Sequence, residues 1–229
     1  SCPFNCKRAV WLPLFTGYYY GERYDETKYA ALVAAARDWH TVEIFPEDFI
    51  NCFDATCDAL AGLRCGPGAV GQYVVARHAA SHGIKTLLTG EGGDELFGGY
   101  ARQIIVAGQK PPDGYEDYCL PSGYPDSIAG ALDFEWSALR QLCSVDERVA
   151  GAWGIKVVPP LLDPWVVAWV HSRFASERIG KKLLKAAMRG VVPDAILDRT
   201  DKRGFPAPFV EWAQEEPVRS FVKDRIGYV

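Results

Sequence analysis

The sequence has 229 residues, of which 48% are hydrophobic and 24% are charged, and its formal net charge is −4. A chain of this length can bury one large core, so we expect a single domain over residues 1–229. The 25 basic and 29 acidic side chains are mixed along the sequence, without the basic stretch typical of proteins that bind nucleic acids or anionic membranes. No apolar run of about 18 residues and no signal peptide occur, which predicts a cytoplasmic protein acting on small molecules.

The cysteines and histidines do not predict a metal site. Seven cysteines are an odd number for a disulfide framework, and Cys52, Cys57 and Cys65 lack the paired spacing of structural zinc ligands. Cys2 and Cys6 form a pair, but no second pair accompanies them. We therefore expect buried free thiols. The four histidines are scattered along the sequence and are expected to be structural or surface residues; they are His40, His78, His82 and His171.

The first half of the sequence alternates between strand and helix patterns. Residues 10–15 form a short apolar run typical of a strand, and residues 24–39 begin with acidic residues and continue as a helix. Residues 41–45 have the β-branched content of a strand, and Pro46 then starts a helix to about residue 60.

The same alternation continues after a glycine-rich loop at residues 65–71. Residues 72–82 predict a helix that Gly83 ends, and residues 85–89 form an apolar strand that we expect to be buried on both faces. Alternating elements with short connections predict an α/β fold with a doubly wound, mostly parallel sheet. In such folds, ligands bind beyond the carboxyl ends of the strands.

The second half is different in character. Residues 110–125 are rich in proline and glycine and predict a loop, and the remaining residues predict mainly helices. Trp165 and Trp169 are one helical turn apart among valines, a spacing that favours core packing over a cofactor stack. We therefore divide the domain into an α/β half at residues 1–109 and a mainly helical half at residues 110–229.

Residues 87–100, directly after the last predicted strand, combine five glycines with three carboxylates. Glycines let the backbone approach a ligand closely, and carboxylates at the carboxyl end of a strand can hold Mg²⁺ or transfer protons. The alternative is a solvated turn in which Asp94 and Glu95 stabilise the amino end of the next helix. Both interpretations stay open on the residues alone.

Residues 88–100 (Leu-Thr-Gly-Glu-Gly-Gly-Asp-Glu-Leu-Phe-Gly-Gly-Tyr) resemble the signature of the C-terminal synthetase domain of the asparagine synthetase family. Further stretches resemble the family in the same order, at residues 24–30, 154–163 and 199–212. The resemblance thus covers nearly the whole chain. It implies a fold like that of the adenine-nucleotide alpha hydrolases, with the nucleotide site in the half at residues 1–109.

The resemblance also implies an activity. Enzymes of this family activate a carboxylate, aspartate or an analogue, with ATP and Mg²⁺ as an acyl-adenylate, release pyrophosphate, and let ammonia attack. The family's ammonia comes from a separate glutaminase domain, which nothing in this sequence resembles. The resemblance therefore predicts an ATP-dependent amide-forming ligase domain with a possible glutaminase domain or subunit as its partner.

By position in the family motif, the resemblance assigns roles in the signature. Thr89, Gly90 and Gly92 would contact the nucleotide, and Asp94 would bind the metal and pyrophosphate. Glu91 would face the reacting carboxyl as general base or substrate contact. These roles suit the chemistry, because an attacking amine must lose a proton and a departing pyrophosphate needs cations.

Lys202 aligns with the family's lysine before Gly-Phe, which implies that it stabilises charge on the phosphate and on the tetrahedral intermediate. Without the resemblance, Lys202 and Arg203 are typical of a solvated turn. Arg199 also receives a role in the site only from the resemblance, and the alternative is that it forms a structural salt bridge.

Two departures from the family pattern bear on activity. The family's domain begins with a strand and a Ser-Gly-Gly-x-Asp-Ser loop that binds the ATP phosphates; residues 1–8 contain no glycine. We expect catalysis to need this element from another segment or a partner. Lys156 and Val158 also replace a glutamate and an arginine of the family, and Leu161 replaces a phenylalanine.

Three explanations of these departures stay open: a fragment or split synthetase, a synthetase with an altered substrate, and an inactive homologue that acts as a binding module. An ATP pyrophosphatase-like enzyme outside this family is a further alternative. We favour the fragment or split synthetase, because an inactive site has no chemical reason to keep Glu91, Asp94 and Lys202 together.

Overall fold

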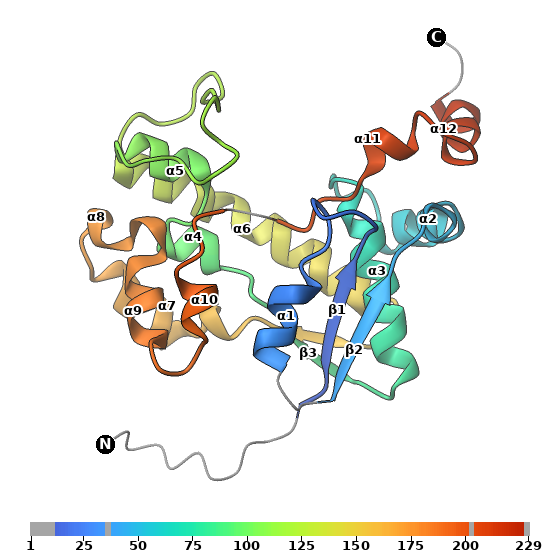
Figure 1. Ribbon diagram of the computed structural model, residues 1–229, viewed down its shortest axis with the longest axis horizontal. Helices are drawn as coiled ribbons and strands as arrows, with labels where there is room; N and C mark the ends of the chain where they lie inside the picture. Colours follow the sequence, from blue (N-terminus) through green and yellow to red (C-terminus); the bar gives the residue numbers. More distant parts are fainter. Residues whose placement is uncertain (1–11, 35–37, 202–203, 227–229) are drawn as a thin grey trace.

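The computed structural model describes residues 12–34, 38–201 and 204–226 of the chain. It is a mixed α/β structure with parallel strands, as expected, and many helices. Figure 1 shows two groups of elements on either side of a long central helix. The first part of the chain forms β1 (Leu14–Tyr18), α1 (Thr27–Ala34), β2 (Trp39–Glu43), α2 (Pro46–Leu60) and α3 (Gly68–Ser81).

Strands β1 and β2 are parallel neighbours, with Leu14 opposite Trp39 and Tyr18 opposite Glu43. The Trp39 indole donates a hydrogen bond to Thr16 Oγ1 at 3.0 Å across the pair. The predicted helix at residues 24–39 was therefore wrong at its end, because Trp39 already belongs to β2. Of the predicted strand at residues 10–15, residues 10 and 11 lie outside the described part of the chain.

Helix α2 has the predicted bounds, and its local sequence explains its start. Pro46 occupies the first turn, and the Asp48 carboxylate accepts a hydrogen bond from the Phe45 backbone N–H at 3.2 Å. Helix α3 begins at Gly68, four residues before the predicted start, and packs against α2 and β1. Val42 of β2 shares a buried core with Phe49 of α2 and Val74 of α3.

The other two strands, β3 (Thr86–Leu88) and β4 (Lys156–Val158), also form a parallel pair. The strands of the described residues thus make two separate two-stranded sheets, and a single doubly wound sheet is not confirmed. The expectation that residues 85–89 are buried on both faces was wrong. Leu87 packs into a core with Val157, whereas the Leu88 side chain, on the other face, is 56% exposed.

Helix α6 (Ile128–Gly151) runs through the middle of the molecule and contacts both groups of elements. Its start is set by Ser127, whose hydroxyl accepts a hydrogen bond from the Gly130 N–H at 3.2 Å. The other helices are α4 (Gly93–Phe97), α5 (Ala101–Val106), α7 (Pro164–His171), α8 (Ala175–Arg178), α9 (Lys182–Met188), α10 (Asp194–Leu197), α11 (Phe209–Trp212) and α12 (Val218–Ile226), with 3-10 turns η1 (Pro160–Leu162) and η2 (Ile179–Lys181).

Helix α7 corrects one prediction about the core. Val170 is fully buried with Leu96 and Phe97, but Trp165 is 85% exposed and Trp169 is 47% exposed. Both tryptophans were expected in the core. The helix is apolar all round, and only its valine face packs against α4, which leaves the tryptophans at the surface.

The cysteines within the described residues are free thiols, as expected. Cys52 is buried, but Cys57, Cys65 and Cys119 are exposed, so the expectation of burial was wrong for these three. Cys2 and Cys6 lie outside the described residues. Among the helices that the structure describes, none has the length and apolar character needed to cross a membrane.

Candidate functional site

A cavity of about 560 Å³ lies between the two strand pairs. Phe15, Thr16 and Gly17 of β1 line it, as do Leu87 of β3 and Val157 of β4. Side chains of α3 and α6 line it as well. Its volume and largely apolar walls are those of a small-molecule pocket of about 300–1,000 Å³.

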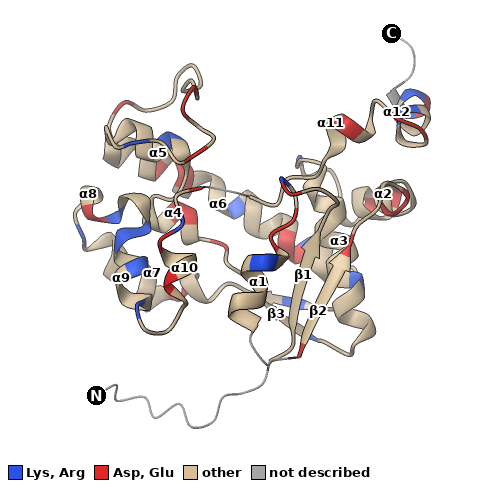
Figure 2. Cartoon of the chain, viewed as in Figure 1, with Lys and Arg blue, Asp and Glu red and all other residues tan. Residues whose placement is uncertain are grey.

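Residues from all four sequence segments that resemble the family line this cavity. They are Tyr24, Glu26, Tyr29 and Ala30; Thr89 and Glu91; Val157; and Arg199, Gly204, Phe205 and Pro206. The segments are far apart in the sequence, so the fold brings them together. Figure 2 shows acidic and basic residues mixed over the whole molecule, without a large region of one sign.

Glu91 follows β3 closely and reaches the cavity wall. Burial, followed by the negative charges of Asp146, Glu95 and Asp94, raises the pKa of Glu91 to about 7. A carboxyl group with this pKa exists in both protonation states near neutral pH. It can therefore accept a proton from an attacking amine, as the sequence predicts for a general base.

Asp146 of α6 is a further carboxylate of the cavity, beside Glu91 and Glu26, and it was not among the predicted site residues. Burial raises its pKa to about 6, against the opposing effect of a hydrogen bond from Gln72 Nε2 at 3.0 Å. Helical spacing was the available signal, because Asp146 precedes the buried Val149 and Ala150 by three and four residues and so shares their face.

Thr89 and Gly90 lie where β3 ends. The Thr89 N–H donates to the Val158 carbonyl at 3.2 Å, and Thr89 lines the cavity. Its hydroxyl oxygen is itself buried and has no hydrogen-bond partner among the described residues, which is costly unless a ligand or water reaches it. Gly90 is exposed, and a Cβ atom there would meet no atom within 4 Å.

Gly92 does not line this cavity. Its φ is +85°, and a Cβ atom there would lie 2.2 Å from Leu162 Cδ2. The glycine is therefore required for the turn and for the contact with η1. Its predicted contact with a nucleotide stays a prediction.

Asp94 lies on α4 beside a second cavity of about 450 Å³ rather than in the first one. Lys181 Nζ lies 3.0 Å from Asp94 Oδ1 and lines the second cavity with Lys185. Because the two cavities share Glu26 and Arg199, they are neighbours. The metal role of Asp94 stays a prediction, and a metal ion there would compete with the Lys181 ammonium.

Arg199 joins the walls of the two cavities. Its guanidinium contacts the Glu26 carboxylate at 2.6 Å and both Asp201 oxygens at 2.8 and 2.9 Å, and it stacks on the Tyr29 ring at 3.8 Å. The salt-bridge alternative for Arg199 is thus confirmed. Lys202 lies outside the described residues, so its role stays a prediction, although residues 204–206 line the first cavity.

Comparison with known proteins agrees with this arrangement. The sequence matches the family described as asparagine synthase over residues 7–112 and 131–228. It is also 26% identical over 245 residues to asparagine synthetase [glutamine-hydrolyzing] 1 of Bacillus subtilis, a match that covers 76% of this chain and 38% of that relative. The match that spans most of the chain includes every segment that lines the cavity, and the chain belongs to the asparagine synthase family.

Proposed function

We propose that this chain is an ATP-dependent, amide-forming ligase domain. It activates a carboxylate, aspartate or an analogue, as an acyl-adenylate, and ammonia then attacks the activated carbon. The observation that carries this proposal is the cavity itself: four separate family segments line it, and it contains Glu91 with a pKa of about 7. A structural role for the signature alone would not require these segments to share a cavity.

The cavity supplies what the nucleotide and the amine require. Its apolar walls suit an adenine ring, and the Thr89 hydroxyl offers a polar contact that no protein atom fills. Glu91 accepts the proton that the amine loses when it attacks. Burial of Glu91, and after it the negative charge of Asp146, keeps the pKa of Glu91 high enough for this transfer.

The neighbouring second cavity suits the phosphates. Lys181 and Lys185 line it, and an ammonium group stabilises phosphate charge. Mg²⁺ would neutralise charge on the departing pyrophosphate, and Asp94 gives the type of oxygen ligand that Mg²⁺ prefers. Asp94 would then exchange its contact with Lys181 for the metal.

In this proposal, a further strand that is supplied by another segment or by a partner completes the ATP site. Within the described residues β1 pairs only with β2 and β3 only with β4, yet both pairs line the first cavity. A strand followed by a Ser-Gly-Gly-x-Asp-Ser loop, inserted between β1 and β3, would join the pairs and add backbone N–H groups for phosphate. Another segment of the same product or a partner would supply it. The B. subtilis relative is glutamine-hydrolysing by name, which supports a glutaminase partner.

The test measures pyrophosphate release from Mg-ATP with ammonium and a panel of carboxylates, beginning with aspartate. The chain is assayed alone and with a polypeptide that carries the strand and phosphate loop. We expect release only in the combined sample and its loss in Glu91→Gln. The matched control is Glu47→Gln, which alters an exposed carboxylate outside both cavities. If no carboxylate gives release in the combined sample, the proposal is wrong.

One observation favours a second function, a binding module without catalysis. Val158 of β4 stands where the family has an arginine, so this chain lacks that charge for an acidic substrate. This alternative predicts that calorimetry detects neither ATP nor AMP binding in the combined sample. A saturable AMP signal that Thr89→Val weakens would exclude it.

A further inference from the structure

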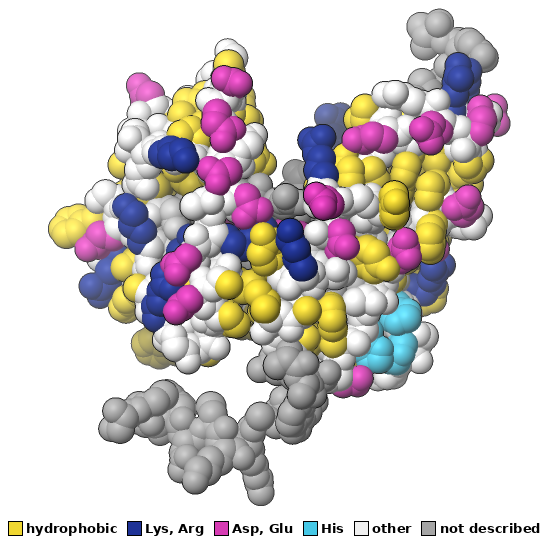
Figure 3. Space-filling view, viewed as in Figure 1, with side chains coloured by type: hydrophobic (Ala, Val, Ile, Leu, Met, Phe, Trp, Pro, Cys, Tyr) yellow, Lys and Arg dark blue, Asp and Glu magenta, His cyan; other side chains and the backbone are white. Residues whose placement is uncertain are grey.

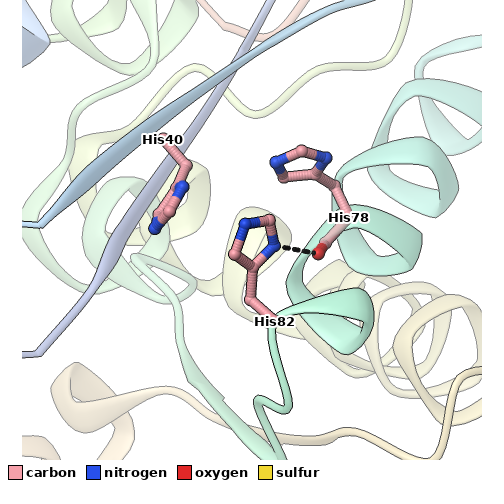
Figure 4. A group of neighbouring side chains, drawn as sticks. All are labelled: His40, His78 and His82. Carbon is pink, nitrogen blue, oxygen red and sulfur yellow. Dashed lines mark hydrogen bonds between the residues drawn. The ribbon is translucent and has the colours of Figure 1, made fainter.

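The fold brings together three of the four histidines that the sequence analysis described as scattered. His40 comes from β2, and His78 and His82 lie one turn apart at the end of α3. A ring nitrogen of each lies within 4.8 Å of a ring nitrogen of the other two, and Figure 4 shows the three rings grouped between the strand and the helix. Residues far apart in the sequence meet here because β2 packs beside α3.

Polar contacts engage one ring nitrogen of His82 and one of His40. His82 Nδ1 lies 2.9 Å from the His78 carbonyl oxygen, so its N–H donates there and the lone pair of Nε2 stays available. His40 Nε2 lies 3.1 Å from the Asp38 carboxylate, which leaves Nδ1 available. A carboxylate or carbonyl behind each imidazole is the usual support of a metal-binding histidine.

Packing also holds the rings in place. Phe15 stacks on His40 with ring centroids 4.9 Å apart and makes edge contacts with His78 and His82. The centroids of His40 and His82 are 4.3 Å apart, and those of His78 and His82 are 4.6 Å apart. The three rings thus pack against one another and against Phe15.

The group is accessible from solvent. His82 is exposed and the other two are half-buried. Figure 3 shows histidine side chains together at the surface, beside the β2 side of the molecule. A cation can therefore enter without unfolding of the core, and water can complete its coordination.

We propose that His40, His78 and His82 bind one divalent cation of the zinc type through three imidazole nitrogens. Zinc accepts three protein nitrogens at about 2.0–2.1 Å with water in the fourth position. The nitrogens must approach one another by small ring rotations, which the exposed position of His82 permits. The bound ion would tie the start of β2 to the end of α3.

The test is calorimetry of Zn²⁺ binding to the full chain, prepared without a histidine tag and cleared of metal by a chelator. We expect one ion per chain. The double variant His78→Asn with His82→Asn should weaken binding at least about a hundredfold, and Asp38→Asn about tenfold, because it removes only the support of His40. His171→Ala is the matched control and should not change the affinity, since His171 lies on α7 against Trp136.

A second measurement does not depend on the folding of any variant. X-ray absorption of the zinc-loaded wild-type chain should show imidazole scattering and no sulfur ligand. Co²⁺, used as a spectroscopic substitute, should give the absorption of a nitrogen and oxygen site. A sulfur ligand, or equal affinity in the wild type and in a folded double variant, would overturn the proposal, because the cysteines would then hold the ion.

Discussion

The signature at residues 88–100 divides into two regions with different surroundings. Thr89 and Glu91 line the cavity, with an unpartnered hydroxyl and a carboxyl of raised pKa. From Gly92 onward the segment is packed against η1 and η2. Most glycines of the signature are therefore required for close packing between helices. The proposed catalytic chemistry depends instead on Thr89 and Glu91, which precede them.

In the packed region, glycines stand where neighbouring atoms leave no room for a side chain. A Cβ atom at Gly98 would lie 2.8 Å from the Ile179 Cα, and one at Gly99 would lie 2.1 Å from Asp94 Oδ1. The Gly180 N–H also donates to the Gly98 carbonyl at 2.8 Å. The backbone of α4 thus lies directly against η2, which places Lys181 beside Asp94.

The largest effect should come from Gly98→Ala in the packed region. Its φ of +61° disfavours alanine, and the new methyl group would lie 2.8 Å from the backbone Cα of Ile179, as well as 2.8 Å from its Cδ1. We expect a loss of about 3 kcal/mol in the free energy of unfolding, measured by urea denaturation. Gly108→Ala is the matched control, because Gly108 has a similar φ of +66° with open space around it, and should cost only about 1 kcal/mol. Equal losses would mean that the contact with η2 is unimportant.

Lys181→Met tests the ion pair that joins α4 to η2. Lys181 and Asp94 are largely buried side chains 3.0 Å apart, so removal of the ammonium should destabilise the fold by about 2 kcal/mol. A double-mutant cycle with Asp94→Asn should give a coupling energy of about 1 kcal/mol or more. Lys182→Met, at an exposed neighbouring position, should be nearly neutral. A coupling energy near zero would show that the ion pair does not stabilise the fold.

Glu91→Gln tests the cavity-facing region through the dependence of stability on pH. The folded-state pKa of about 7 lies above the ordinary value of 4.5, so the folded chain holds the Glu91 proton more tightly than the unfolded chain. Wild-type stability should therefore fall as the pH rises between these two values. With allowance for solvent screening, Glu91→Gln should be more stable by on the order of 1 kcal/mol at about pH 8, and the difference should vanish below about pH 4.5. Thermal unfolding of the wild type and of Glu91→Gln across this pH range measures the slope of the wild type and the difference between the two proteins. The opposite slope would contradict the burial of Glu91.

The smallest change in stability should come from Thr89→Val. The valine keeps the shape of threonine and removes a hydroxyl that has no partner in the protein, so the free energy of unfolding should change by less than about 0.5 kcal/mol. Calorimetry should nevertheless show weaker AMP binding in the sample completed with the phosphate loop. Thr86→Val, at an exposed position of β3, is the control for both measurements. A large loss of stability in Thr89→Val would show that its hydroxyl serves the fold.

Local sequence signals predicted the elements that depend on local chemistry. Pro46 and Asp48 set the start of α2, and the predicted helix agreed with the structure. The features that could not be predicted depend on packing between elements that are distant in the sequence. Nothing near Leu88 in the sequence shows that one face of β3 is left uncovered, and nothing near Trp165 shows which face of α7 meets α4.

The site could be predicted only in part for the same reason. The signature identified Thr89 and Glu91, which line the cavity, but Asp146 comes from a helix whose partners are distant in the sequence. The pair His78 and His82, at helical spacing, was a usable signal for a metal site. His40 could not be added without knowledge that β2 lies beside α3.

The contact of Arg199 with Glu26 and Tyr29 has a consequence for synthesis in the cell. Glu26 and Tyr29 meet Arg199, so in a chain that is still growing on the ribosome this part of the cavity wall cannot close until residue 199 has emerged. Contacts of such long sequence separation slow folding and leave apolar surface open meanwhile. Slower translation would lengthen that exposed interval, and chaperones would be needed most during it.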